Sequence, residues 1–278
     1  MDGDKRAKDS SNQNKQTDTF YRRRLPHWQP AGATIFLTWR LYGSLPQEAL
    51  DQLAAERQLL EKQPVRLDET SRDRALRHSK RLFALADEML ARNIYGPQWL
   101  KDERIAPLVV DALFFHDSSL YMLLAFVVMP NHVHVVLTPL EERTDLPTDE
   151  RIEEQAGKPA PHMGQDFIPH GEQNFQTVSR QAEALAPHHV PLRRITQSLK
   201  GYTAREANRL LRRTGQTFWQ DESYDHWVRD EAELGRIVVY IEWDPVRAGL
   251  VASPEEWPWS SAWERKWGRL KDRPWQVG

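Results

Sequence analysis

Short runs of apolar residues mark the predicted strands of this chain. Residues 33–41 and 120–128 are rich in β-branched, aromatic and aliphatic side chains, and residues 132–138 follow the second run after a Pro-Asn turn. Such runs, bounded by turn residues, are typical of β-strands. A weaker run at residues 226–228 predicts a short last strand.

Apolar residues three or four positions apart predict helices in the segments between these strands. The pattern covers residues 46–60, 71–93, 105–115, 191–213 and 230–244. The last of these helices opens with Asp230 and Glu233, which match a capping box. Pro245 makes helical geometry unfavourable at Asp244, so we expect the helix to end about there.

The order of these elements predicts one α+β domain. Strand, helices, strand and strand form the first half of a split βαβ sandwich, so we expect a ferredoxin-like antiparallel sheet with helices, including extra ones. The domain is expected at residues 21–263, between a disordered tail at 1–20 and a C-terminal tail at 264–278. Residues 141–189 are acidic and show little periodicity, which predicts a flexible, irregular surface insertion.

Composition narrows the class of protein. The chain has 278 residues, of which 40% are hydrophobic and 28% charged, as in ordinary soluble globular proteins. It contains no cysteine, which excludes disulfides, cysteine–zinc sites and cysteine nucleophiles. The N-terminus is polar, and the apolar stretches fall short of the roughly 20 residues that a membrane span needs, so we expect a cytoplasmic protein without a membrane partner.

The net charge of −2 hides an uneven distribution. Residues 141–186 hold ten acidic and four basic residues, so the rest of the chain is net positive. The positive charge is clustered, at Arg22, Arg23, Arg24, Arg193, Arg194, Lys200, Arg205 and Arg209. Charge of one sign on a helix favours contact with nucleic-acid phosphates, although a basic helix face can also serve solubility alone.

Two histidines one residue apart, His132 and His134, lie on the third predicted strand. Side chains alternate along a strand, so both imidazoles are expected on one face, with Val133 and Val135 on the other. Two imidazoles side by side can supply half or more of a divalent metal site. An isolated pair of this kind is also explained by two surface or partly buried histidines.

Tyr240 and Asp244 could add a nucleophile and a third metal ligand to the histidine pair. They lie four residues apart on the last predicted helix and therefore on one flank of it. Alone, they are explained by a tyrosine at the edge of the core and an aspartate that shapes a turn. Together with His132 and His134, Asp244 would complete three of the four to six ligands of a divalent ion. Tyr240 would then attack a phosphodiester to form a covalent phosphotyrosine, and no Gly-rich phosphate loop is present to bind a nucleotide cofactor.

Several ordered motifs resemble a known protein family. Residues 129–137 (MPNHVHVVL) resemble the histidine–hydrophobic–histidine motif of the single-tyrosine HUH transposases. Further segments are similar to the branch called REP-associated tyrosine transposases: 197–204 (QSLKGYTA), 218–220 (FWQ), 240–251 (YIEWDPVRAGLV) and 257–261 (WPWSS). The resemblance covers roughly residues 21–140 and 191–263.

The resemblance implies a ferredoxin-like HUH domain that acts on single-stranded DNA with Mg²⁺ or Mn²⁺ and recognises short palindromic hairpins of the REP type. It also implies that Tyr240 is the nucleophile and that His132 and His134 bind the metal. Where the family commonly has Asn or Gln four residues after the tyrosine, this chain has Asp244, a competent ligand that could alter the metal preference. The insertion at 141–189 is not part of the family pattern.

The leading hypothesis is therefore a metal-dependent endonuclease and strand transferase with a 5′-phosphotyrosine intermediate. One alternative is a non-cleaving regulator that binds hairpin nucleic acid, derived from such a transposase. Another is a metal-dependent phosphodiesterase that uses activated water. Monomer and homodimer are both compatible with the motifs, and we favour an active site in which Tyr240 meets the histidines within one chain.

Overall fold

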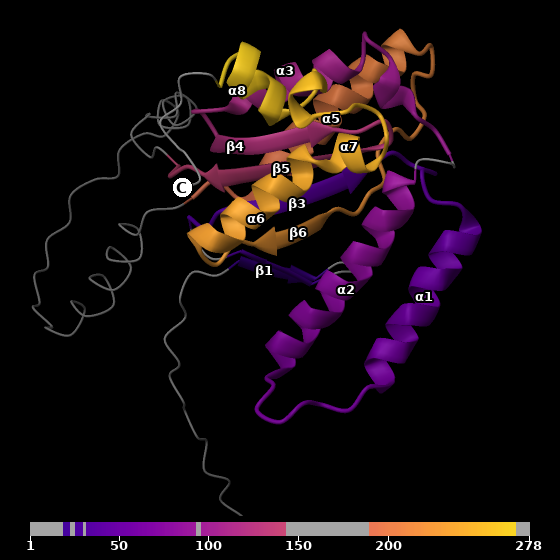
Figure 1. The fold of residues 1–278 in the computed structure, drawn as a ribbon, viewed down its shortest axis with the longest axis vertical. Coiled ribbons are helices and arrows are strands. Elements are labelled where there is room, and N and C mark those ends of the chain that lie inside the picture. The colour runs from indigo at the N-terminus through magenta and orange to yellow at the C-terminus, as the bar shows by residue number, and fades with distance from the viewer. Residues whose placement is uncertain (1–18, 23–25, 30–31, 93–95, 143–188, 271–278) are drawn as a thin grey trace, which may run out of the picture.

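The computed structural model describes residues 19–22, 26–29, 32–92, 96–142 and 189–270 (Figure 1). Most of the predicted N-terminal tail and nearly all of the predicted insertion lie outside these residues. The same holds for Arg23 and Arg24, and for Arg22 the backbone alone is described.

A four-stranded antiparallel sheet forms the centre of the fold. Its strands are β3 (Ile35–Arg40), β4 (Tyr121–Val128), β5 (His132–Pro139) and β6 (Tyr224–Trp227), and they lie side by side in the order β4-β5-β3-β6. With helices between β3 and β4 and between β5 and β6, the chain follows a split β-α-β-β-α-β course. The predicted α+β class and all four predicted strands are confirmed.

Three helices cover the two faces of this sheet, namely α3 (Ala106–His116), α5 (Leu192–Leu210) and α6 (Glu231–Glu242). On the face covered by α3 and α5, which we call the core face, Leu37 and Ile195 belong to a large buried apolar cluster. The opposite face, which we call the site face, is crossed by α6 (Figure 1), and there Phe36, Val136 and Ile241 form a second cluster. Because both faces are covered, the strands are apolar along nearly their whole length.

A helical hairpin of α1 (Gln47–Lys62) and α2 (Ser71–Ala91) extends away from the sheet (Figure 1). The side chain of Thr70 accepts a hydrogen bond from the backbone of Asp73, whose carboxylate in turn accepts one from the backbone of Thr70. This capping box starts α2. Towards the other end of α2, Asp87 and Leu90 are buried.

The two ends of the described domain differ from the expected boundaries. Residues 19 and 20, expected in the tail, belong to β1 (Thr19–Arg22), which pairs with β2 (Pro26–Gln29) in a separate two-stranded sheet. At the other end, α8 (Ser261–Trp267) includes residues expected in the C-terminal tail. Leu270 is buried in the core cluster, so this segment packs as part of the domain.

The chain after α6 also departs from the expectation. The helix itself ends at Glu242, but Asp244 opens a short second helix, α7 (Asp244–Arg247), instead of leaving helical geometry. Pro245 stands in the first turn of α7, where a missing N–H removes no intrahelical hydrogen bond. Proline therefore divides the helix here without unwinding it at Asp244.

Two short 3₁₀ helices, η1 (Trp99–Lys101) and η3 (Pro254–Glu256), complete the regular elements of the described chain. In that part of the chain, none of the helices is both long and apolar enough to span a membrane.

Candidate active site

The two histidines of β5 lie side by side on the site face, and both are fully buried. Their Nε2 atoms are 3.1 Å apart. In the register of the sheet, His134 stands opposite Thr38 and His132 stands opposite Arg40 of β3. Because side chains alternate between the two faces along β5, both imidazoles lie next to each other on the site face.

Hydrogen bonds on the far side of each ring fix its orientation. The side-chain N–H of Asn131 donates a hydrogen bond to the carbonyl oxygen of Leu90 at 3.1 Å. The side-chain oxygen of Asn131 therefore faces Nδ1 of His132, at 2.7 Å. Nδ1 of His132 must then carry a hydrogen, which leaves Nε2 of the neutral ring as an acceptor. His134 Nδ1 is likewise 2.7 Å from the hydroxyl oxygen of Thr38. This is the arrangement in which outer partners orient metal-binding imidazoles.

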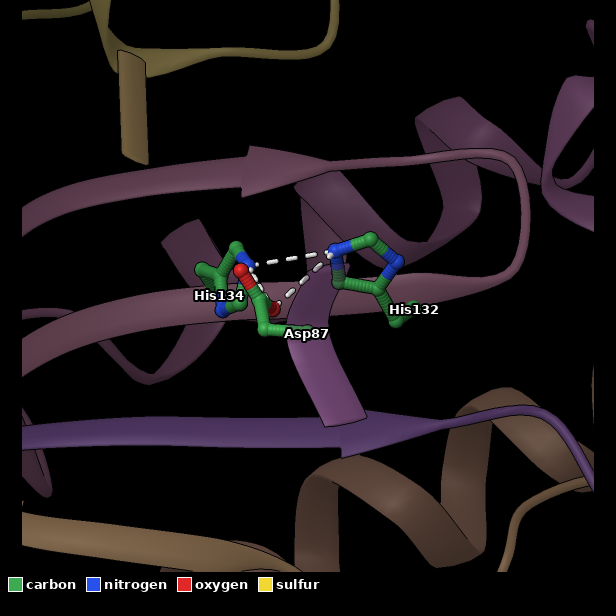
Figure 2. Close-up of side chains that lie close together, drawn as sticks. All are labelled: Asp87, His132 and His134. Carbon is green, nitrogen blue, oxygen red and sulfur yellow. Dashed lines mark hydrogen bonds and ion pairs between the residues drawn. The ribbon is translucent and has the colours of Figure 1, made fainter. Parts of the chain in front are cut away.

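A carboxylate that sequence reasoning missed, Asp87 of α2, completes the cluster (Figure 2). Its Oδ1 lies 3.1 Å from His134 Nε2 and 3.9 Å from His132 Nε2. One ligand atom from each of these three residues lies within 4.8 Å of the others. The sequence signal was present, because Asp87 shares the helix face of Phe83 and Leu90, where an apolar residue is expected.

Asp244, the carboxylate that the sequence did predict, also reaches the histidines. Its Oδ2 lies 3.2 Å from His132 Nε2 and 3.7 Å from His134 Nε2. Its Oδ1 accepts a hydrogen bond from Arg247 at 3.1 Å. Asp244 is fully buried, so its charge is balanced within the cluster and not by solvent.

Tyr240 lies in the same cluster and in the same chain. Its hydroxyl donates a short hydrogen bond to Oδ2 of Asp87, while Oδ1 of the same carboxylate faces the histidines. The Tyr240 and His134 rings are 6.2 Å apart between centroids, and the Arg247 guanidinium lies 4.1 Å from the Tyr240 ring. Tyr240, Asp87 and the two histidines of one chain therefore lie together.

The charges of the cluster depend on one another. Burial opposes ionisation of Asp87 and Asp244, but the nearby imidazoles outweigh it and hold the pKa of both carboxyls below the ordinary value. Burial lowers the pKa of His134, but the carboxylates of Asp87 and Asp244 together outweigh it, so the net shift is upward. Burial and the neighbouring Asp87 both raise the pKa of Tyr240 far above that of a free phenol. At neutral pH the carboxylates are ionised and Tyr240 holds its proton.

The donor set fits a divalent cation. Two imidazole nitrogens and a carboxylate oxygen converge, and the buried Oδ1 of Asp87 faces both Nε2 atoms. The two Nε2 atoms lie 3.1 Å apart and can both turn to one ion once they are free of protons. The mixture of imidazole and carboxylate ligands suits a first-row ion such as Mn²⁺ better than an all-oxygen site would.

Five of the basic residues predicted to bind DNA lie on α5, on the core face and away from the histidines, namely Arg193, Arg194, Lys200, Arg205 and Arg209. Arg194 forms an ion pair with Glu142, and Arg209 forms one with Glu206 at 3.0 Å. Lys200 donates to the backbone carbonyls of the 220–221 loop, at 2.7 and 2.8 Å. Arg193 and Arg205 have exposed side chains. The structure thus separates the basic helix from the candidate metal cluster by the thickness of the sheet.

Comparisons with known proteins give one likeness. No family model matches the chain, and no curated protein matches it. Among solved structures, the chain is similar to a REP-associated tyrosine transposase bound to a REP hairpin, with 16% sequence identity and a TM-score of 0.36. That likeness covers 92% of this chain and 88% of the other. A TM-score this low does not establish a common fold.

Proposed function

We propose that this protein is a metal-dependent endonuclease and strand transferase for single-stranded DNA that acts through Tyr240. The observation that carries the proposal is the contact of the Tyr240 hydroxyl with Asp87, directly beside His132 and His134. A phenol held against a metal-binding carboxylate is the arrangement that tyrosine attack on a phosphodiester requires. The HUH-like motif around residues 129–137 supports the same chemistry.

The reaction can be assigned to this chain's own residues. His132, His134 and Asp87, with Asp244 beside them, would hold Mg²⁺ or Mn²⁺, which when bound neutralises charge on the phosphate. Tyr240 Oη attacks the phosphorus, and the bond from phosphorus to the 3′ oxygen breaks. Oδ2 of Asp87 accepts the hydrogen bond of the phenol and so stands where the phenolic proton must leave.

The products are a 5′-phosphotyrosine on the enzyme and a free 3′ hydroxyl on the released strand, whose oxygen takes up the proton that Tyr240 lost to Asp87. Because the phosphodiester is exchanged and not hydrolysed, a 3′ hydroxyl can attack the phosphotyrosine and rejoin DNA without a nucleotide cofactor. Palindromic hairpins of the REP type are the proposed targets, on the strength of the ordered motifs at 197–204 and 240–251.

Adduct trapping tests the proposal. The protein is incubated with Mn²⁺ and labelled hairpin oligonucleotides taken from palindromic repeats near its gene, then denatured and separated by electrophoresis. We expect a denaturation-resistant protein–DNA adduct that chelator abolishes. Tyr240→Phe should abolish it, whereas Tyr42→Phe, which alters an exposed tyrosine, should not.

The outcomes separate the alternatives. Full cleavage by Tyr240→Phe would contradict the proposal. Turnover without an adduct would indicate a phosphodiesterase that uses activated water. Hairpin binding with neither nicking nor adduct in the parent protein would indicate a non-cleaving regulator.

A further inference from the structure

A pocket of about 450 Å³ lies between the α1–α2 hairpin and the edge of the sheet. Its volume is within the range of about 300–1,000 Å³ that is usual for small-molecule sites. Asp87 lines it, and so does Thr38, the partner of His134. The pocket therefore begins at the candidate metal cluster and extends away from it beneath the hairpin.

One side of the pocket is apolar and aromatic. Leu53 and Ala54 of α1 line it together with Phe83 of α2. Phe83 stacks on Tyr224 of β6, with ring centroids 4.0 Å apart, and both rings line the pocket. Planar apolar walls of this kind suit the face of a nucleobase, since every base can stack on an aromatic or apolar surface.

The polar part of the pocket holds two arginines, Arg40 and Arg57, beside two carboxylates, Asp87 of the candidate metal cluster and Glu222. Among the described residues, neither arginine forms an ion pair. Arg40 stands opposite His132 in the sheet and donates one long hydrogen bond, of 3.3 Å, to Ser44. Burial lowers the pKa of Arg40, so the site holds a partly desolvated cation that an anion would stabilise.

The pocket is also connected to the basic helix on the core face. Gln220, Glu222 and Ser223 line it, and the same three residues line a groove beside Arg193 and Lys200 of α5. The 220–223 loop is therefore a shared wall. A single strand that contacts α5 can pass this loop at the β6 edge of the sheet and reach Asp87.

We propose that this pocket binds one unpaired nucleotide next to the phosphodiester that Tyr240 cleaves. The base would lie against Leu53, Ala54 and Phe83, and its phosphate would contact Arg40 and Arg57. This inference rests on the proposed function, because the neighbouring nucleotide reaches the pocket only if the scissile phosphate lies at Tyr240. Arg40 and Arg57, which form no ion pair within the described part of the chain, favour a nucleotide over an uncharged apolar ligand.

An abasic scan tests the pocket through binding alone. The Tyr240→Phe protein, which should not cleave, is titrated with fluorescent hairpin oligonucleotides that carry one abasic site at successive positions of the single-stranded flank. We expect one position next to the cleaved phosphate to weaken binding by about five- to a hundredfold, as loss of one stacked base does. The other flank positions should change Kd much less.

Pocket-filling variants locate this effect. Leu53→Trp and Ala54→Trp, each built on Tyr240→Phe, should weaken binding of the intact oligonucleotide and abolish the sensitivity to the abasic position. Leu59→Trp is the matched control, because Leu59 is exposed on the same helix and does not line the pocket. Thermal unfolding of each variant checks that it folds, and two fillers at different positions keep the test decisive.

The results distinguish this inference from the proposed function. A trapped adduct together with uniform binding across the flank, or a position effect that survives both fillers, would overturn the pocket alone. A position effect that the fillers abolish, without any adduct from the parent protein, would overturn the tyrosine chemistry and leave a nucleotide in the pocket.

Discussion

The two faces of the sheet are built from the same strands but contain different chemistry. On the core face, Leu37 and its neighbours join Leu113 and Ile195 in a continuous apolar cluster. On the site face, the apolar cluster around Phe36 adjoins buried imidazoles and carboxylates, among them those of His132, His134, Asp87 and Asp244. Alternate residues of β3 and β5 therefore serve different purposes: one set packs, and the other set brings His134 and its partners together.

This difference separates stability from function. Apolar burial stabilises a fold in proportion to the area removed from water. Buried ionisable groups are costly to desolvate, and their removal in favour of apolar residues is often neutral or stabilising. A cluster such as Asp87, His132, His134 and Asp244, with shifted pKa values, marks a functional site better than a structural one. Substitutions on the two faces should therefore affect different measurements.

Leu37→Ala should have the largest effect on stability. Leu37 is fully buried on the core face, and truncation of such a leucine costs about 2–5 kcal/mol through lost transfer free energy and the cavity left behind. Urea denaturation measures this loss, and titration with Mn²⁺ should give a Kd near that of the parent protein. A large loss of metal affinity in a folded Leu37→Ala protein would contradict the proposal that the core face serves stability and the site face serves metal binding.

His134→Ala should produce the reverse result. Loss of an outer partner costs roughly 10- to 100-fold in metal affinity, and loss of a ligand itself should exceed that, to more than about 100-fold. Calorimetric titration with Mn²⁺ provides the measurement. His116→Ala is the matched control, because His116 contacts Ser198 on the core side. Unchanged Mn²⁺ affinity in His134→Ala would show that the metal does not bind on the site face.

Local patterns were enough to predict the strands and the orientation of the histidine pair. The period of two along residues 132–138 fixes which side chains share a face, whatever the rest of the fold does. Asp87 could not be assigned in this way, because its role depends on how α2 meets the sheet. That contact joins residues about 45 positions apart in sequence, between Asp87 and the two histidines, and no local period encodes it.

The same limit explains the missed ends of the domain. Two short strands with little apolar pattern, β1 and β2, are defined by their pairing with each other. The segment after residue 263 lacks a clear period but packs through Leu270 and through Glu264, which binds Arg269. Tyr240 and Asp244 were predicted together from their spacing of four residues, although Tyr240 lies on α6 and Asp244 opens α7, and only the folded chain brings them to the histidines.

Thr38→Val sharpens the comparison within a single strand. It removes the hydroxyl that holds His134 Nδ1 and leaves a side chain of nearly the same shape. We expect a 10- to 100-fold loss of Mn²⁺ affinity, because an outer partner orients the ring and sets its tautomer. Thr34→Val is the control, since its hydroxyl bonds Thr138 and no histidine. Equal metal affinities in the two variants would show that the Thr38 contact does not orient the ligand.

Arg193 and Arg194 offer the test with the smallest expected effect. Both lie on the solvent side of α5, the helix that covers the core face. They are adjacent on α5, but Arg194 forms an ion pair with Glu142, whereas Arg193 forms no ion pair among the described residues. Each phosphate that a free cation neutralises contributes about 0.7 to the slope of log Kd against log salt for single strands. Arg193→Gln should therefore reduce that slope by about this amount for a hairpin oligonucleotide with single-stranded flanks. Arg194→Gln should reduce it less, because Glu142 already competes for the guanidinium. Equal decreases of the slope in the two variants would mean that DNA displaces Glu142 from Arg194. An unchanged slope in both variants would mean that the bound strand does not contact α5.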